Sequence, residues 1–467
     1  MVFSSLTFLF LFLPITLGVY YLVPRSWKNF VLFVSGLLFF AWGEPIFVLL
    51  LLFTVTLDYF CGRMIAYFDD KKSLRVLFLL LSLSLDIGIL LVFKYNSFFV
   101  QNINAIFGLS LTDPQIPLPL GISFYTFQSM SYTIDVFRRN VKSQKSYIDY
   151  GAYVMLFPQI VAGPIVRYSD IEQELAERRI TRSDLAEGIG IFLAGLGKKV
   201  LLANNIGALW SEIKAIDPAN LDALTAWMGI LAFTLQIYYD FSGYSDMAVG
   251  MGKMMGFAFP KNFDYPYESH SVSEFWRRWH MTLGGWFRDY VYISLGGNRK
   301  GKGRTLLNLA IVWMLTGFWH GASWNFVLWG LYFGLWIILE RLFLGKWLAK
   351  WPKALSCLWT FLIVIFGWVL FEAVDLSWAG GFVSAMFGAG GYASAGNAPY
   401  YALNYGFVLM AGALLAGQKV PDFFRSLRAK YPRVSAVVLP VCQTLLFLIC
   451  IAFLVDATYN PFLYFRF

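Results

Sequence analysis

The chain has 467 residues, of which 58% are hydrophobic, 19% aromatic and only 14% charged. An ordinary soluble domain carries about 25% charged residues, so this balance excludes both a water-soluble globule and a disordered chain. The net charge of +9 fits either nucleic acid or anionic lipid as a partner, and the positions of the basic residues decide between them.

Apolar runs long enough to cross a bilayer recur along the chain and predict about 11–12 transmembrane helices. The first, residues 2–23, has no basic segment ahead of it and no cleavage site after it, so we expect a retained span and not a signal peptide. The others cover residues 29–44, 45–61, 76–94, 117–137, 187–208, 223–243, 305–321, 324–340, 354–372, 401–417 and 434–455. The sequence therefore predicts an all-α polytopic membrane protein.

The loops between these runs differ in charge. Lys and Arg gather in residues 25–28, 63–75, 138–145, 253–304, 341–353 and 419–433, whereas 95–116 and 373–400 contain neither. By the positive-inside rule, the basic loops are cytoplasmic. Because the basic residues are spread over many loops and do not form one docking element, the sequence argues against nucleic acid as a partner.

One further apolar run, residues 147–166, breaks this alternation. It is followed by four arginines between Arg167 and Arg182, which should stay on the cytoplasmic side. Pro158, Gly163 and Pro164 interrupt the run. We therefore expect a re-entrant or broken element buried among other helices, with a kinked ordinary span as the alternative.

Only three histidines occur in the chain, at His270, His280 and His320. If the run that begins after Arg304 is helical, His320 lies about 24 Å along it, in the outer half of the membrane. An ionisable group at that depth is a hypothesis of function, and the alternative is a neutral histidine hydrogen-bonded between helices. His270 has no apolar run around it, so we expect a solvated loop residue.

Residues 258–304 are too charged to span a bilayer and too aromatic to form a free loop. Tryptophans and arginines alternate in this segment: Trp276, Arg277, Arg278, Trp279, Trp286 and Arg288. The pattern is typical of cytoplasmic helices that lie at the membrane interface. Membrane anchoring explains it, and so does a surface that binds the phosphates and adenine of a carrier such as coenzyme A.

Polar side chains also interrupt two apolar runs. Gln128 lies within residues 117–137, and Asp240 and Ser242 lie at the cytoplasmic end of residues 223–243. Such groups either hydrogen-bond between helices or line a substrate tunnel. The sequence has no G-x-x-x-x-G-K-[ST] or G-x-S-x-G motif, which disfavours an ATP-driven pump and a serine hydrolase.

Several of these segments resemble motifs of the membrane-bound O-acyltransferases. They are Leu118-Pro-Leu-Gly-Ile-Ser-Phe-Tyr-Thr-Phe-Gln128, Phe157-Pro-Gln-Ile-Val-Ala-Gly-Pro164, Tyr239-Asp-Phe-Ser-Gly-Tyr-Ser-Asp-Met247, Glu274-Phe-Trp-Arg-Arg-Trp-His280, Trp286-Phe-Arg-Asp-Tyr-Val-Tyr292 and Gly317-Phe-Trp-His-Gly321. The chain is most similar to the bacterial branch that contains the membrane subunit of alginate O-acetylation. The resemblance extends from Met1 to about residue 340.

The resemblance implies one integral-membrane acyltransferase domain over residues 1–467, with helices around a central tunnel and 258–304 as a cytoplasmic or interfacial helical segment. It implies that His320 is the principal catalytic histidine and that His280 is the second. It implies no metal and no bound cofactor. The residues expected to bind the donor or line the tunnel are Arg277, Arg278, Trp279, Arg288, Asp289, Gln128, Asp240, Ser242 and Asn325.

The implied function is transfer of an acyl group, acetyl in this branch, from a cytoplasmic thioester across the bacterial cytoplasmic (inner) membrane to an exported polysaccharide such as alginate. The implied donor is acetyl-coenzyme A or an acyl-carrier thioester, and the implied partner is an exported acetyltransferase of the SGNH-hydrolase type. One alternative is transfer of D-alanine or another acyl group from a carrier protein to a cell-wall polymer. From a different class, a secondary transporter of a small organic anion fits the apolar runs, but the sequence shows no related halves.

Overall fold

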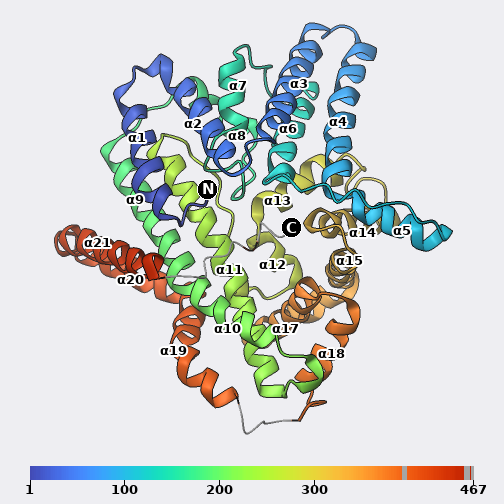
Figure 1. Cartoon of the computed structure of the whole chain (residues 1–467), viewed down its shortest axis with the longest axis vertical. Helices are drawn as coiled ribbons and strands as arrows, with labels where there is room; N and C mark the ends of the chain where they lie inside the picture. The colour runs from blue at the N-terminus through green and yellow to red at the C-terminus, as the bar shows by residue number, and fades with distance from the viewer. Residues whose placement is uncertain (392–396, 457–462, 464–467) are drawn as a thin grey trace. The chain divides into compact units, whose positions relative to one another are not determined.

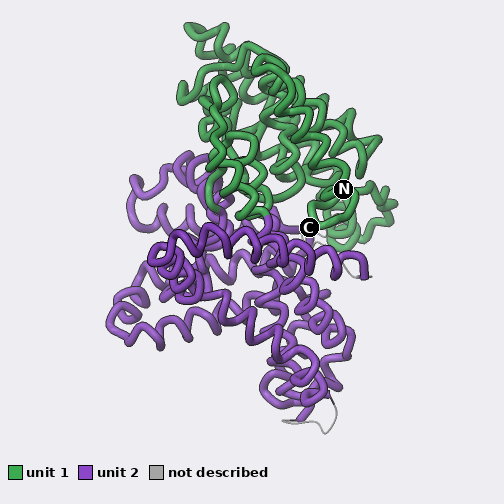
Figure 2. Tube along the Cα trace, turned by 90° about the vertical axis from the view of Figure 1, so that its left-hand side faces the viewer, with its two compact units in different colours: residues 1–192, 245–261 green, residues 193–244, 262–467 purple. Residues whose placement is uncertain are grey.

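A computed structural model of the chain describes residues 1–391, 397–456 and 463 (Figure 1). These residues form helices and no strand, which confirms the predicted all-α class. The chain divides into two compact units (Figure 2). Unit 1 holds residues 1–192 and 245–261, and unit 2 holds residues 193–244 and 262–467. The single domain expected from the resemblance stays a prediction.

Unit 1 is built from the N-terminal helices, among which α3, α4 and α6 pack side by side (Figure 1). Its elements are the π-helical turn η1 (Phe8–Phe12), α1 (Leu13–Leu22), the 3-10 turn η2 (Arg25–Trp27), α2 (Lys28–Gly43), α3 (Val48–Tyr67), α4 (Lys72–Lys94), α5 (Asn96–Phe107), α6 (Ile122–Phe137), α7 (Tyr147–Val154) and α8 (Tyr168–Ala176). Two further helices, α9 (Arg182–Gly197) and α11 (Ala223–Met254), carry residues of both units.

Unit 2 contains the remaining helices. They are η3 (Lys198–Ala203), α10 (Asn204–Lys214), η4 (Pro218–Asn220), η5 (Pro266–Glu268), α12 (Val272–Arg278), α13 (Met281–Trp286), η6 (Phe287–Tyr292), α14 (Lys302–His320), α15 (Trp324–Leu339), η7 (Glu340–Leu344), α16 (Gly345–Leu348), α17 (Lys353–Glu372), α18 (Leu376–Met386), α19 (Ala398–Leu415), α20 (Lys419–Lys430) and α21 (Pro432–Asp456). The segment 258–304 forms short helices and turns and the start of α14. Its position at the membrane interface stays a prediction.

Among the described residues, five helical stretches are long and apolar enough to cross a membrane. They are α3, α4, α17, α21 and the stretch Trp324–Leu348, and the bent pair of α19 and α20 adds a sixth if it counts as one span. The apolar runs predict about twice as many. The difference arises because several runs fold into shorter helices: α2 and α6 each have 16 residues, about 24 Å against the roughly 30 Å of the hydrocarbon core.

The predicted broken element at residues 147–166 is confirmed as irregular and buried. Helix α7 ends at Val154, and the chain then continues without a helix to α8, while every residue from 151 to 166 is buried. The segment lies tightly against α2, since a Cβ on Gly36 would stand 1.9 Å from the carbonyl oxygen of Met155. Whether this element spans or re-enters a membrane stays a prediction.

Candidate active site

The position of His320 follows from the close packing of α14 against α15. A Cβ on Gly317 would stand 2.2 Å from the carbonyl oxygen of Phe326, and a Cβ on Gly330 would stand 2.3 Å from that of Trp313. Only glycine therefore lets the two backbones approach this closely, a device common between membrane helices. His320 is the last residue of α14, one turn beyond this crossing.

Aromatic rings surround the His320 imidazole within unit 2. The side chain is only 3% exposed. Ring centroids of Trp319, Trp329 and Phe371 lie 4.9, 5.0 and 5.5 Å from the imidazole, each meeting it edge to face. These rings exclude water and fix the orientation of the imidazole, so a histidine here can exchange protons with only those groups that enter the same space.

His280 has a constrained backbone and a fixed ring. It precedes α13 with φ +43°, a left-handed conformation that is uncommon for residues other than glycine. Its Nδ1 lies 3.1 Å from Oδ1 of Asn262. That oxygen also accepts hydrogen bonds from the backbone N–H and the hydroxyl of Thr282, so it is an acceptor. His280 must therefore donate from Nδ1, which leaves the lone pair on Nε2.

The two histidine rings both contact one indole, that of Trp319. The Trp319 ring lies 4.9 Å from the His320 ring and 6.0 Å from the His280 ring, measured between centroids. The His280 ring also meets the Phe241 ring edge to face at 4.6 Å. Residues 40 positions apart in the sequence thus share one aromatic wall, so the structure brings the two predicted catalytic residues together.

Burial determines the charge state of the His280 ring. The ring is 2% exposed, and this desolvation lowers the pKa of His280 to about 3. The residue is therefore neutral at physiological pH and is a weak base. A neutral ring with Nδ1–H fixed by Asn262 is suited to orienting a neighbouring group or accepting a hydrogen bond at Nε2.

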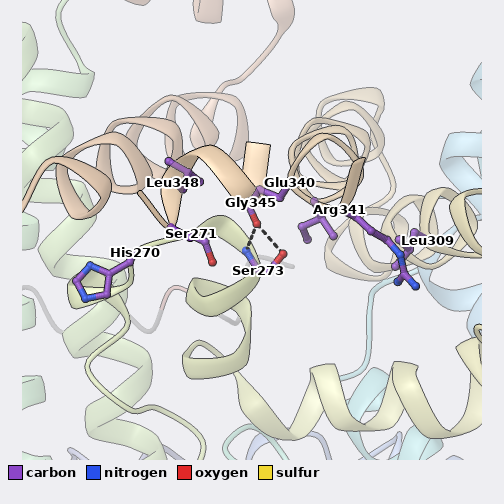
Figure 3. A pocket seen from close by; sticks show the side chains of 10 residues that line it. His270, Ser271, Ser273, Leu309, Glu340, Arg341, Gly345 and Leu348 are labelled. Carbon is purple, nitrogen blue, oxygen red and sulfur yellow. Dashed lines mark hydrogen bonds between the residues drawn. The ribbon is translucent and has the colours of Figure 1, made fainter. Parts of the chain in front are cut away.

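A carboxylate anchors the helix that leads to His280. Glu340 accepts hydrogen bonds from the backbone N–H groups of Val272 and Ser273 at 2.6 and 2.9 Å, and from the Ser273 hydroxyl at 2.6 Å. These contacts hold the start of α12 against η7. A pocket of about 460 Å³ opens beside them (Figure 3). His270 lines this pocket, with Nδ1 3.2 Å from the carbonyl oxygen of Lys353, and is half-buried rather than freely solvated.

The arginines proposed for the donor have different surroundings. Arg277 is exposed, whereas Arg278 forms an ion pair with Glu274 at 2.6 Å. Arg288 pairs with the neighbouring Asp289 at 2.6 Å. Trp279 is buried, stacked on Phe275 at 5.6 Å and packed against Trp368 at 4.9 Å. Arg277 is therefore the best placed of the three arginines to meet an incoming anion, while Trp279 belongs to the aromatic packing.

The polar residues proposed for a tunnel are all buried. Asp240 forms a salt bridge with Lys199 and accepts a hydrogen bond from the backbone N–H of Leu463 at 2.8 Å. Ser242 is fully buried, two residues further along α11. Asn325 donates to the carbonyl oxygen of Ala373 at 2.8 Å, which ties α15 to the end of α17.

Gln128 is fully buried on α6, in unit 1, and its side-chain amide has no hydrogen-bond partner in the described part of the chain. Its relation to the histidines, and the central tunnel itself, stay predictions.

Three residues of the site are not evident from the sequence. Asn262 stands 18 positions before His280, so no local motif joins them. Trp329 and Phe371 come from other helices, and a chain with 17 tryptophans and 46 phenylalanines offers no signal to single them out. Asn262 is the most useful of the three because it sets the tautomer of His280.

Comparison with known families agrees with this geometry. Residues 63–374 match MBOAT, the membrane-bound O-acyltransferase family, a stretch that includes both histidines. The chain belongs to this family and is an acyltransferase. Its apolar helices and its family together make it an integral membrane protein.

Several relatives of the chain have names that describe acyl transfer. The probable alginate O-acetylase AlgI of Pseudomonas putida is 40% identical, and the alignment covers 100% of each chain. The peptidoglycan O-acetyltransferase of Helicobacter pylori is 32% identical over 84% of this chain and 80% of its own. The teichoic acid D-alanyltransferase of Streptococcus thermophilus is 28% identical over 54% of this chain and 68% of its own.

Proposed function

We propose that this protein transfers an acetyl group from a thioester donor to a hydroxyl group in the O-acetylation of an exported polysaccharide such as alginate. The observation that carries the proposal is the contact that the His280 and His320 rings both make with the Trp319 indole, within the part of the chain that matches the family. The alginate and peptidoglycan O-acetylating relatives, which align over most of the chain, support acetyl as the group transferred.

The proposed chemistry divides the work between the histidines. The acceptor hydroxyl oxygen attacks the thioester carbonyl carbon as His320 takes the hydroxyl proton, the carbon–sulfur bond breaks, and the proton passes to the leaving thiolate. His280 is a poor base because burial lowers its pKa to about 3, and it orients a reactant through Nε2. A transient acyl-histidine on His320 is the second route that this arrangement supports.

The donor and the partner are further parts of the proposal. Acetyl-coenzyme A, or an acyl-carrier thioester, approaches from the side of the basic segment 258–304, where Arg277 is exposed. An exported acetyltransferase of the SGNH-hydrolase type receives the group on the outer side and places it on the polymer. The proposal places the protein in the bacterial inner membrane, with the basic segment on the cytoplasmic face by the positive-inside rule.

Transfer of D-alanine is the second candidate. The D-alanyltransferase relative supports it, but that similarity covers only 54% of this chain. An organic-anion transporter is disfavoured by membership of an acyltransferase family.

Proteoliposomes test the proposal directly. Purified protein is supplied with radiolabelled acetyl-coenzyme A on one side only, and label on an acceptor glycan or an exported partner is measured. We expect transfer by the wild type, loss of at least about a hundredfold in His320→Ala, and little change in His270→Ala, which lies outside the cluster. Transfer retained in His320→Ala would remove His320 from the mechanism, and equal transfer from either side would contradict the cross-membrane arrangement.

A further inference from the structure

A polar pocket of about 530 Å³ lies in unit 1, beside the first turn of α2. It is formed by the connection between α1 and α2, by α7 and by the end of α8. Its lining includes Arg25, Lys28, Asn29, Asp149, Leu175 and Arg178. Three of these side chains are cations and one is a carboxylate, so the pocket has an excess of positive charge.

Arg178 is held in this pocket by neutral groups. Its Nε donates to the Tyr20 hydroxyl at 2.7 Å, and its Nη1 donates to the carbonyl oxygen of Glu174 at 3.0 Å. The guanidinium lies over the Phe257 ring at 4.6 Å. Its Nη2 is buried and has no hydrogen-bond partner among the described residues. No carboxylate pairs with this guanidinium among the described residues, so an anion in the pocket would interact favourably with its charge.

Lys28 adds a second positive charge to the same pocket. Its ammonium nitrogen lies 4.7 Å from the centroid of the Tyr20 ring and 5.8 Å from that of Tyr21. Burial, followed by the charges of Arg178 and Arg25, lowers the pKa of Lys28. The three cations therefore repel one another, which is the electrostatic condition that an anion relieves.

The start of α2 adds the positive end of a helix dipole to these charges. Lys28 is its first residue, no acidic residue stands in its first turn, and the side chain of Trp27 does not cap it. A helix N-terminus carries partial positive charge, so a lysine is unfavourable there and an anion is favourable. The two acidic groups nearby offset the three cations only in part. Asp149 keeps one negative charge while it accepts from Asn29 at 2.7 Å, and Glu177, which pairs with Arg25 at 3.3 Å, is 82% exposed and therefore screened by solvent.

We propose that this pocket binds a phosphate group, carried either by an anionic phospholipid or by a soluble phosphate anion. The surroundings favour the lipid, because the connection between α1 and α2 also exposes Leu22, Trp27 and Phe30. Exposed indole and aliphatic groups beside cations are typical of headgroup depth, and the basic loop 25–28 is cytoplasmic by the positive-inside rule. The assignment is independent of the acetyl-transfer chemistry.

The test measures binding to the full-length protein in detergent. The two probes are fluorescent short-chain phosphatidylglycerol in mixed micelles with phosphatidylcholine, and inorganic phosphate as a competitor. Lys28→Gln removes one cation at the rim of the pocket. Lys72→Gln is the matched control, because Lys72 is an exposed lysine that also begins a helix of unit 1. Arg178→Gln is a second variant, used only where thermal unfolding shows that it is folded.

We expect Lys28→Gln to weaken phosphatidylglycerol binding roughly tenfold, because it removes a charge-assisted contact. Lys72→Gln should change it by less than about twofold. Competition by millimolar inorganic phosphate would identify a soluble anion as the ligand, and binding of the lipid without such competition would identify the headgroup. Binding of neither probe, or equal effects of Lys28→Gln and Lys72→Gln, would overturn the proposal.

Discussion

The Nδ1 atom of His280 lies 3.1 Å from Oδ1 of Asn262, and this contact decides which nitrogen of the ring carries a proton. Because the same oxygen accepts from Thr282 at 2.9 Å, it cannot act as a donor to the imidazole. The lone pair of His280 is therefore on Nε2 in the resting protein. Asn262 is a positioning residue: it acts on the reaction through His280.

Replacement of Asn262 tests that role. Asn262→Ala frees the imidazole to rotate and to exchange tautomers, so acetyl transfer should fall roughly tenfold to a hundredfold. Asn262→Asp keeps an acceptor and adds a negative charge, which raises the pKa of His280 and should move the acidic limb of the pH–rate profile to higher pH. If Asn262 were purely structural, its replacement would lower activity without moving the pH–rate profile. The pH–rate profile of Asn262→Asp is therefore the measurement that tests the positioning role.

The lowered pKa of His280 predicts acid sensitivity of the fold. In the unfolded chain the ring has its ordinary pKa of 6.5, whereas burial lowers the folded value to about 3. The unfolded state thus binds the proton first as pH falls. The stability that depends on a neutral ring is present above pH 6.5 and is lost progressively between 6.5 and 3. Thermal unfolding in detergent at pH 7.5 and pH 5 should show a smaller difference in His280→Gln than in the wild type. Equal differences would contradict the burial of this ring.

The glycine crossing between α14 and α15 predicts a strong local effect. Gly317→Ala places a Cβ 2.2 Å from the carbonyl oxygen of Phe326, so the helices must separate, at a cost of about 1–3 kcal/mol. Because His320 follows one turn later, acetyl transfer should fall as well. Gly303→Ala is the control on the same helix, since its Cβ would meet nothing within 4 Å. It should be neutral or stabilising by up to about 1 kcal/mol. Thermal unfolding and transfer are measured on both.

The buried carboxylate of Glu340 should contribute more to the free energy of unfolding than an exposed carboxylate does. Glu340→Ala leaves the N–H groups of Val272 and Ser273 without their charged acceptor, and we expect a loss of about 1.5–3 kcal/mol. The comparison is Glu187→Ala, whose carboxylate pairs with Lys253 at 2.7 Å but is 58% exposed. That loss should be about 0–1 kcal/mol. Similar melting temperatures for the two variants would show that the contacts at the start of α12 contribute little.

The sequence predicts those features that depend on local chemistry. Pro158 and Pro164 disfavour a continuous helix through residues 155–166, so the break after α7 can be predicted from the residue types alone. His320 is found because an ionisable group in an apolar run is rare.

Features set by distant contacts are not found in this way. Asn262 reaches His280 across 18 positions, and Glu340 reaches Ser273 across 67. The number of membrane-length helices is also overestimated from apolar runs, because such runs include residues that precede a helix. Residues 117–121 are one example, since α6 begins only at Ile122.

The contact between Gly36 and the irregular segment has a consequence for how the protein is made. Residues 155–166 have no helix of their own to satisfy their backbone groups, and at membrane depth such a stretch is stable only when it is buried in protein. It needs α2 already beside it, with Gly36 against Met155. Biogenesis therefore has an order: the N-terminal helices must be retained near the site of insertion until the broken segment emerges.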